Sequence, residues 1–312
     1  MSHRDRTWVM VLAGGGADPL ESQKGQVISP DRNRFGALLG RPSLLRMTLS
    51  RARSIVPGER ICLVIDRAQK RYWSSSFAAL SYANVIVQPC NRGSAVGMLL
   101  SVLSILERDP WARVVAMPSD HYVNDEPALA GSLLDAVTPT AHTRNNVALV
   151  GIKPEEADPD LSYIVPGRWF EDGTRSVQRL VTSTGKALAH ELVARGALWD
   201  SSIVAARAVV LLSVLRARMP ALVDQMETAL AQGDGPNVRA DALTQLYARL
   251  PFVDFSHVVA DGAAPECRVI TSRSCGWSNL KTARQVAAVM RRMPLAGQSA
   301  TASGHVRQVI SP

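Results

Sequence analysis

The first half of the chain alternates short apolar, β-branched runs with longer segments in which apolar residues recur every three or four positions. Short apolar runs between turn residues are typical of buried strands, and the longer repeat is typical of helices that cover a sheet. We predict strands over 8–12, 60–65, 84–88, 113–117 and 146–152, and helices over 42–55, 68–81, 94–107 and 126–137. This alternation predicts an open α/β sheet of mostly parallel strands.

After Gly151 the pattern changes to short strands followed by a run of helices. Here we predict strands over 163–165, 176–181, 202–205 and 267–271, and helices over 187–195, 207–218, 220–231, 239–250 and 282–292. We expect one domain over 1–295, with a first half to about residue 155 and a lobe over about 156–295. Residues 296–312 are small and polar, which predicts a disordered tail.

The composition indicates a globular protein with a large core. The 312 residues are 46% hydrophobic and 20% charged. No apolar run reaches the roughly 18 residues that a membrane span needs, and the N-terminal segment has no signal-peptide core. We therefore expect a cytoplasmic protein without a membrane partner.

The net charge of +8 comes from arginine, since the chain has only five lysines. A basic surface can favour phosphate-bearing ligands. The basic residues are scattered, without the clusters and interleaved aromatic residues of single-stranded nucleic-acid binders, so no nucleic-acid partner is expected. The four cysteines show no CxxC spacing, which argues against a zinc site and a disulfide framework.

Three polar or glycine-rich segments each follow a predicted strand. The first contains Leu12, Ala13, Gly14, Gly15 and Gly16, the second runs from Gln88 to Ala95, and the third contains Ser119 and Asp120. Ligands of open α/β sheets bind beyond the carboxyl ends of the strands, so we expect one crevice to collect all three. Consecutive glycines present backbone N–H groups to phosphate, and the long connection from Gly14 to Arg41 predicts a flap over the crevice.

Seven segments in the same order resemble the sugar-1-phosphate nucleotidyltransferases, and mannose-1-phosphate guanylyltransferases in particular. They are Leu12 to Gly16, Phe35 to Leu45, Gln88 to Ala95, Met117 to Val123, Gly151 to Pro154, Gly196 to Ile203 and Gly276 to Leu280. The resemblance extends from Val9 to about Val289. It implies a Rossmann-like nucleotidyltransferase fold with a mixed, mostly parallel sheet, whose second half is an acceptor-side lobe.

The resemblance also implies a reaction and its partners. A nucleotidyl group, with GTP as the expected donor, would pass to a hexose 1-phosphate, with mannose 1-phosphate as the expected acceptor, and pyrophosphate would leave. Mg²⁺ is the implied cofactor. Such phosphoryl transfer depends on positioning and charge neutralisation more than on covalent steps. The sequence leaves the oligomeric state open, with a homodimer as one alternative.

Site residues follow from the same match. Asp120 and Asn279 would hold the metal, and Asp120 with Arg92 would serve catalysis; a turn role for Asp120 and a surface ion pair for Arg92 are the alternatives. The nucleotide would contact the glycine segment and the residues Gln88, Asn91, Gly93 and Ser94. The sugar phosphate would contact Trp199, Asp200 and Ser201. His121 and Trp277 are expected to be structural.

Several positions depart from the family pattern. Pro19 stands where the family has an arginine, Asn33 where it has a lysine, and Asn279 where it has an aspartate. The family's E-K-P and Y-G segments correspond to Thr182–Thr184 and Leu161–Ser162. Losing a charged ligand commonly costs about two to three orders of magnitude in rate. The alternative hypothesis is therefore a catalytically inactive relative that binds nucleotide or nucleotide-sugar, or regulates an active subunit.

Overall fold

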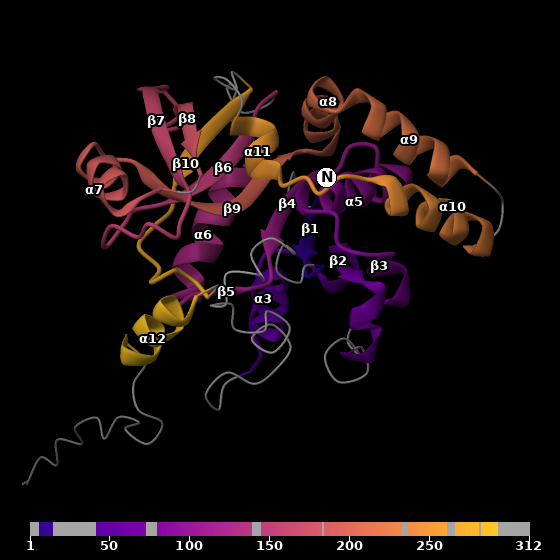
Figure 1. The fold of residues 1–312 in the computed structure, drawn as a ribbon, viewed down its shortest axis with the longest axis horizontal. Coiled ribbons are helices and arrows are strands. Elements are labelled where there is room, and N and C mark those ends of the chain that lie inside the picture. The colour runs from indigo at the N-terminus through magenta and orange to yellow at the C-terminus, as the bar shows by residue number, and fades with distance from the viewer. Residues whose placement is uncertain are drawn as a thin grey trace, which may run out of the picture.

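A nine-stranded sheet runs through the molecule in the computed structural model (Figure 1). The structure describes residues 6–14, 42–72, 80–138, 145–182, 184–232, 236–260, 266–280 and 282–292. The strand order is β3-β2-β1-β4-β9-β6-β10-β8-β7. Strands β8 and β9 run against the other seven, so the sheet is mixed and mostly parallel, as predicted.

The first-half strands are β1 (Thr7–Leu12), β2 (Ile61–Asp66), β3 (Val85–Gln88), β4 (Arg113–Pro118) and β6 (Val147–Ile152). The second-half strands are β7 (Tyr163–Trp169), β8 (Arg175–Val181), β9 (Leu198–Arg207) and β10 (Cys267–Thr271). A separate two-stranded ribbon pairs β5 (His121–Tyr122) with β11 (Ser278–Asn279). All predicted strands are present, whereas the ribbon was not predicted.

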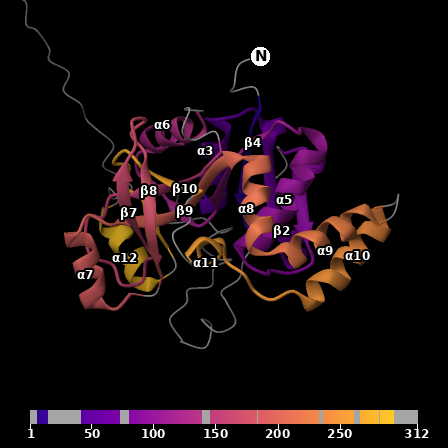
Figure 2. The ribbon, with the colours of Figure 1, turned by 90° about the horizontal axis from the view of Figure 1, so that it is seen from above.

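Strand β1 shows how the sequence builds a core on each side of the sheet. Successive strand residues point to opposite faces. Trp8 and Met10 pack in one apolar cluster with helices α5, α8, α9, α10 and α11, and Val9 and Val11 pack in the other with α3, α6 and α7. Figure 2 shows α3 and α6 on one side and α8 and α11 on the other. All four β1 residues are buried, which fits a central strand.

The helices agree closely with the apolar repeats. Their bounds are α3 Leu44–Arg53, α5 Ser94–Arg108, α6 Glu126–Val137, α7 Lys186–Ala194, α8 Ala208–Arg218, α9 Pro220–Ala231, α10 Pro236–Arg249, α11 Phe255–Ala260 and α12 Ala283–Arg292. Gly196 follows α7 with φ +77°, the left-handed conformation that commonly ends a helix.

The helix predicted over 68–81 is wrong where the structure describes it. Arg67–Tyr72 forms a short 3-10 helix, η3, and Leu80 and Ser81 belong to no helix. The six-residue helix α11 was missed because it is too short to display a helical repeat. The predicted flap over 14–41 and the tail over 296–312 lie outside the described residues, apart from Gly14.

Strand β9 joins the two halves of the chain. It pairs antiparallel with β4 on one side and with β6 on the other, and it also pairs with β7. The predicted lobe over 156–295 therefore contributes the strand at the centre of the sheet.

The four cysteines lie in or near the core. Cys62, Cys267 and Cys275 are buried and Cys90 is half-buried, all as free thiols. Burial raises the pKa of the Cys62 and Cys267 thiols to about 12, so both stay protonated at neutral pH. Within the described parts of the chain, no helix has the length and apolar character needed to cross a bilayer.

Candidate functional site

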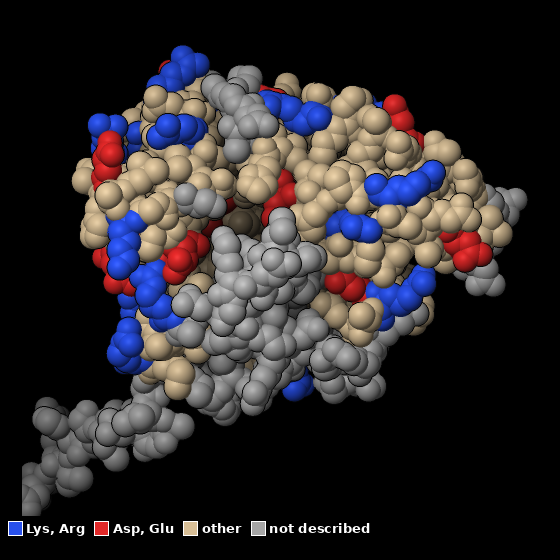
Figure 3. Space-filling view, viewed as in Figure 1, with Lys and Arg blue, Asp and Glu red and all other residues tan. Residues whose placement is uncertain are grey.

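The candidate site lies where the order of the parallel strands reverses. Strands β1, β2 and β3 follow one another in one direction, and β4 then pairs with the other side of β1. The carboxyl ends of strands flanking such a reversal are the usual ligand position in α/β sheets. Figure 3 shows a hollow in the middle of this face, with acidic side chains at its rim and basic side chains further out.

The glycine turn after β1 is held by β2. The N–H groups of Ala13 and Gly14 both donate to the carbonyl of Val64, at 2.8 and 2.9 Å. The expectation that Gly14 presents a free N–H group is therefore wrong. Gly15 and Gly16, the remaining glycines of the predicted phosphate loop, lie outside the described residues.

Gln88 forms a buried chain of hydrogen bonds between two elements. Its Nε2 donates to Asp66 Oδ1 at 3.1 Å, and its Oε1 accepts from the Tyr247 hydroxyl at 3.1 Å. All three residues are buried. A Cβ atom at Gly14 would lie only 2.3 Å from Gln88 Nε2, so any larger residue at position 14 would have to displace this amide.

The segment that follows Gln88 binds the connection between α10 and α11. Asn91 Oδ1 accepts from the Gly93 N–H at 2.9 Å. The Ser94 N–H and hydroxyl both donate to Asp254 Oδ1, at 3.1 and 3.0 Å. The N-terminus of α5 is thus capped by a carboxylate of the same chain, an arrangement that suits the positive end of the helix dipole. The nucleotide contacts predicted for Asn91, Gly93 and Ser94 stay predictions.

Arg92 has a structural role that the sequence did not indicate. Its Nε donates to the Tyr247 carbonyl at 2.8 Å and its Nη2 to the Ala248 carbonyl at 3.5 Å, both in the last turn of α10. A guanidinium at this position satisfies carbonyls that the helix leaves without partners. Neither the phosphate contact nor the surface ion pair predicted for Arg92 is part of this arrangement.

The ribbon places Asn279 one residue away from Asp120 in the pairing register. Asn279 pairs with His121, the residue directly after Asp120. Asp120 lies at the end of β4, with its Oδ1 3.8 Å from His121 Nε2. His121 is buried and its ring meets the Trp277 ring edge-on, with centroids 5.0 Å apart, so both residues pack as structural elements, as expected.

The oxygen atoms of Ser119, Asp120 and Asn279 are of the kind that bind a magnesium ion. Asn279 Oδ1 and Ser119 Oγ are buried oxygens with no hydrogen-bond partner in the described structure, and such atoms commonly mark a missing ion or water. Magnesium prefers oxygen ligands and keeps several waters, so one carboxylate and a carbonyl oxygen suffice when phosphate oxygens complete the set. Among the described residues no group of three or more His, Cys, Asp or Glu side chains could hold a metal.

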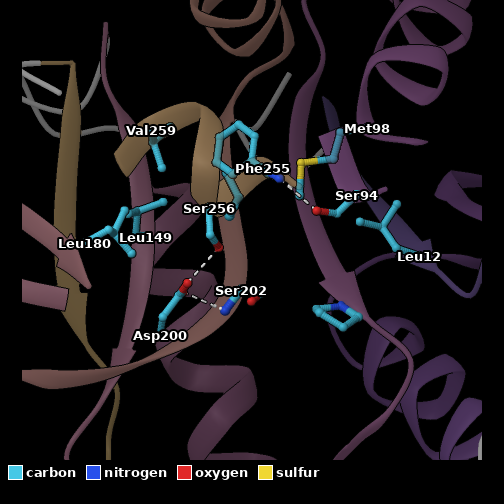
Figure 4. A pocket seen from close by; sticks show the side chains of 12 residues that line it. Leu12, Ser94, Met98, Leu149, Leu180, Asp200, Ser202, Phe255, Ser256 and Val259 are labelled. Atoms are coloured by element: carbon cyan, nitrogen blue, oxygen red, sulfur yellow. Dashed lines mark hydrogen bonds between the residues drawn. The ribbon is translucent and has the colours of Figure 1, made fainter. Parts of the chain in front are cut away.

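All three predicted sugar-phosphate residues are buried, and one of them also lines a pocket. Trp199 is buried and its Nε1 donates to Tyr163 Oη at 3.3 Å. Ser201 is fully buried, with its hydroxyl donating to the Val150 carbonyl at 2.5 Å. Asp200 reaches the pocket, where Oδ2 accepts from the Ser256 hydroxyl at 2.9 Å (Figure 4). Of the three, only Asp200 is placed to meet a ligand from this pocket.

The pocket beside Asp200 is narrow and mostly apolar. Its lining residues are Leu12, Ser94, Met98, Pro118, Leu149, Leu180, Asp200, Ser202, Val204, Phe255, Ser256 and Val259. The cavity measures about 30 Å³, which holds one or two water molecules. Helix α11 closes it with Phe255, whose N–H donates to Ser94 Oγ at 2.9 Å. A nucleotide therefore does not fit in this pocket as it stands.

Ser202 occupies a strained backbone position. Its φ is +53°, the only positive φ of a non-glycine residue in the described part of the chain, and its N–H donates to Asp200 Oδ1 at 2.8 Å. A positive φ is the left-handed conformation that favours glycine, so the Ser202 side chain strains the backbone here.

We expect Ser202→Gly to stabilise the protein. Removing the side chain relieves the left-handed strain, which is worth about 1 kcal/mol in unfolding free energy, while the N–H bond to Asp200 can remain. Thermal denaturation followed by circular dichroism measures the change. A lower midpoint in Ser202→Gly would mean that contacts of the Ser202 side chain outweigh the strain.

Other departures from the family pattern are only partly visible. Thr182 is half-buried after β8, and Thr184 is buried, with its hydroxyl donating to the Pro159 carbonyl at 3.3 Å. Pro19 and Asn33 lie outside the described residues. Sequence reasoning missed the contributions of Asp66, Tyr247, Asp254 and Ser256. Only Asp66 carried a signal, since a carboxylate directly after a buried strand lies at the binding edge.

Comparison with known proteins gives relatives of low identity. The chain is 24% identical over 255 residues to the alginate biosynthesis protein AlgA of Pseudomonas syringae pv. tomato, covering 79% of this chain and 51% of AlgA. It is 26% identical over 231 residues to mannose-1-phosphate guanylyltransferase 2 of Escherichia coli O157:H7, covering 70% and 46%. The chain thus spans about half the length of these relatives. No family model matches.

A solved structure shares the fold. The crystal structure of mannose-1-phosphate geranyltransferase from Thermus thermophilus superposes with a TM-score of 0.71 at 24% sequence identity. The match covers 88% of this chain and 76% of that one. At this identity the match establishes the α/β fold.

Proposed function

We propose that this chain, which is related in sequence and fold to the sugar-1-phosphate nucleotidyltransferases, is an enzyme that transfers GMP from GTP to mannose 1-phosphate. The products are GDP-mannose and pyrophosphate, and the proposed location is the cytoplasm. The names of the relatives motivate the choice of substrates. The observation that carries the proposal is that Asn279 pairs with His121, the residue after Asp120, beside the strand-order reversal.

In the proposed reaction an oxygen of the sugar phosphate attacks the α-phosphorus of the nucleotide, and pyrophosphate leaves. Magnesium, when bound, neutralises phosphate charge. Asp120 and the Asn279 carbonyl oxygen would hold the ion near the end of β4, and the adjacent turn after β1 would position the nucleotide. The attacking oxygen is already ionised near neutral pH, so no side chain has to remove a proton.

The test is pyrophosphate release by the purified protein with Mg²⁺, mannose 1-phosphate and each of the four nucleoside triphosphates. We expect release that requires the sugar phosphate and is fastest with GTP. Omission of the sugar phosphate and chelation of the metal are the controls. If no nucleotide gives pyrophosphate release under conditions where nucleotide binding is detectable, the proposed enzymatic activity is rejected.

A second candidate is a nucleotide-binding relative without turnover. Two observations favour it: an amide stands at the second metal position, and no lysine or arginine lines the described pocket beside Asp200. A carbonyl oxygen adds no negative charge to the metal site. This candidate predicts nucleotide binding by calorimetry without pyrophosphate release.

A further inference from the structure

We propose that Asp66 and Tyr247 are positioning residues that fix the orientation of the Gln88 side-chain amide and thereby select bases that carry a carbonyl group. The inference rests on the proposed function only in requiring that the chain binds a nucleotide. It concerns two residues from distant parts of the chain, one at the end of β2 and one in α10.

The orientation of the amide follows from its two neighbours. An amide can turn over and exchange its oxygen and nitrogen. The Asp66 carboxylate accepts hydrogen bonds and does not donate them, so Nε2 must face Asp66, at 3.1 Å. Oε1 must then face Tyr247, whose hydroxyl donates at 3.1 Å. The two contacts support each other, since each is lost when the amide turns over.

Tyr247 is suited to this donor role. It is fully buried, and its own carbonyl accepts from Arg92 Nε, which fixes the end of α10 against the segment after β3. Burial, and then the Asp66 carboxylate, raise the pKa of the Tyr247 hydroxyl well above its usual range. The hydroxyl therefore remains a donor across the physiological pH range.

The fixed amide presents an N–H donor beside the glycine turn. Nε2 carries two hydrogens, and only one of them has a partner among the described residues, namely Asp66 Oδ1. Nε2 lies where the side chain of residue 14 would be, 2.3 Å from the position of a Cβ atom on Gly14. Gln88 is 2% exposed, and the second N–H of its amide is the donor that we assign to a base bound next to Gly14. Guanine O6 and uracil O4 accept a hydrogen bond, whereas the adenine and cytosine amines at the same edge donate one.

Calorimetric titration with GTP, UTP, ATP and CTP in Mg²⁺ tests the inference in the wild type and in Tyr247→Phe and Asp66→Asn. We expect the wild type to bind GTP and UTP more tightly than ATP and CTP. In either variant the ratio of these affinities should fall about fivefold to tenfold, because each removes a bond that holds the amide in one orientation. Tyr82→Phe, at a tyrosine that is 73% exposed, is the matched control and should keep the ratio.

The outcomes separate positioning from simple support of the fold. Equal losses of affinity for all four nucleotides would show a structural role alone and overturn the inference, as would a wild type without the expected preference. A wild type that shows the preference but releases no pyrophosphate would reject only the proposed catalysis. Absence of all nucleotide binding would reject both. The thermal midpoint of each variant shows whether it is folded.

Discussion

Asp120→Asn is expected to lower the rate of pyrophosphate release by about two to three orders of magnitude. The change keeps the shape of the side chain and removes the negative charge at the end of β4. With Asn279 paired to the neighbouring His121, the proposed metal site would then contain two amides and no carboxylate. Magnesium would be held less tightly, and the charge that develops on the departing pyrophosphate would be less well neutralised.

The readout is the steady-state rate of pyrophosphate release against Mg²⁺ concentration, together with Mg²⁺-dependent nucleotide affinity by calorimetry. Asp241→Asn, at an exposed position of α10, is the matched control and should change neither. An Asp120→Asn protein that keeps the wild-type rate and metal dependence would show that Asp120 is a turn residue. If the wild type binds nucleotide without turnover, only the metal-dependent affinity should fall.

Gly93→Ala is expected to destabilise the folded protein by about 3 kcal/mol or more. Gly93 has φ +91°, and a Cβ atom on it would lie 2.2 Å from the Val253 carbonyl oxygen. Backbone strain and this collision add together, and the colliding atom is backbone, which cannot rotate away. The thermal midpoint should fall by roughly 5–10 °C, and the connection before α11 should become sensitive to protease.

Gly173→Ala separates the two causes. Gly173 has φ +78°, similar to that of Gly93, but its Cβ atom would meet nothing within 4 Å. The Gly173→Ala substitution should therefore add only backbone strain, which lowers the unfolding free energy by about 1 kcal/mol. Equal losses of unfolding free energy in Gly93→Ala and Gly173→Ala would mean that the Val253 segment moves aside easily. Its packing against the N-terminus of α5 would then contribute little to stability.

The sequence was sufficient for most of the elements, and the reasons are local. Strand β1 is short and apolar, and α6 is preceded by the N-cap residue Asp125, whose side chain accepts from the Ala128 N–H. Such signals are carried by neighbouring residues and need no knowledge of the fold. Asp120 could be placed at the crevice for the same reason, since it follows a predicted parallel strand.

What the sequence could not give are contacts between distant segments. Arg92 was expected near phosphate, but it binds carbonyls of α10, and Ser94 binds Asp254, 160 positions further along the chain. The pattern around Arg92 contains nothing that specifies a partner so far away. Likewise, the two-residue ribbon strands are too short for any alternation to show, although they pair Asn279 with His121, the residue after Asp120.

The place of β9 between β4 and β6 has a consequence for how the protein is made. During translation β4 leaves the ribosome more than eighty residues before its second neighbour, because β4 ends at Pro118 and β9 extends to Arg207. Until then a nascent chain exposes one edge of β4, and exposed apolar edges invite aggregation. The side of β4 that pairs with β9 can therefore complete its pairing only after the second half of the chain has been made. A ribosome stalled before residue 198 would hold a chain with this edge unpaired, a state that chaperones protect from aggregation.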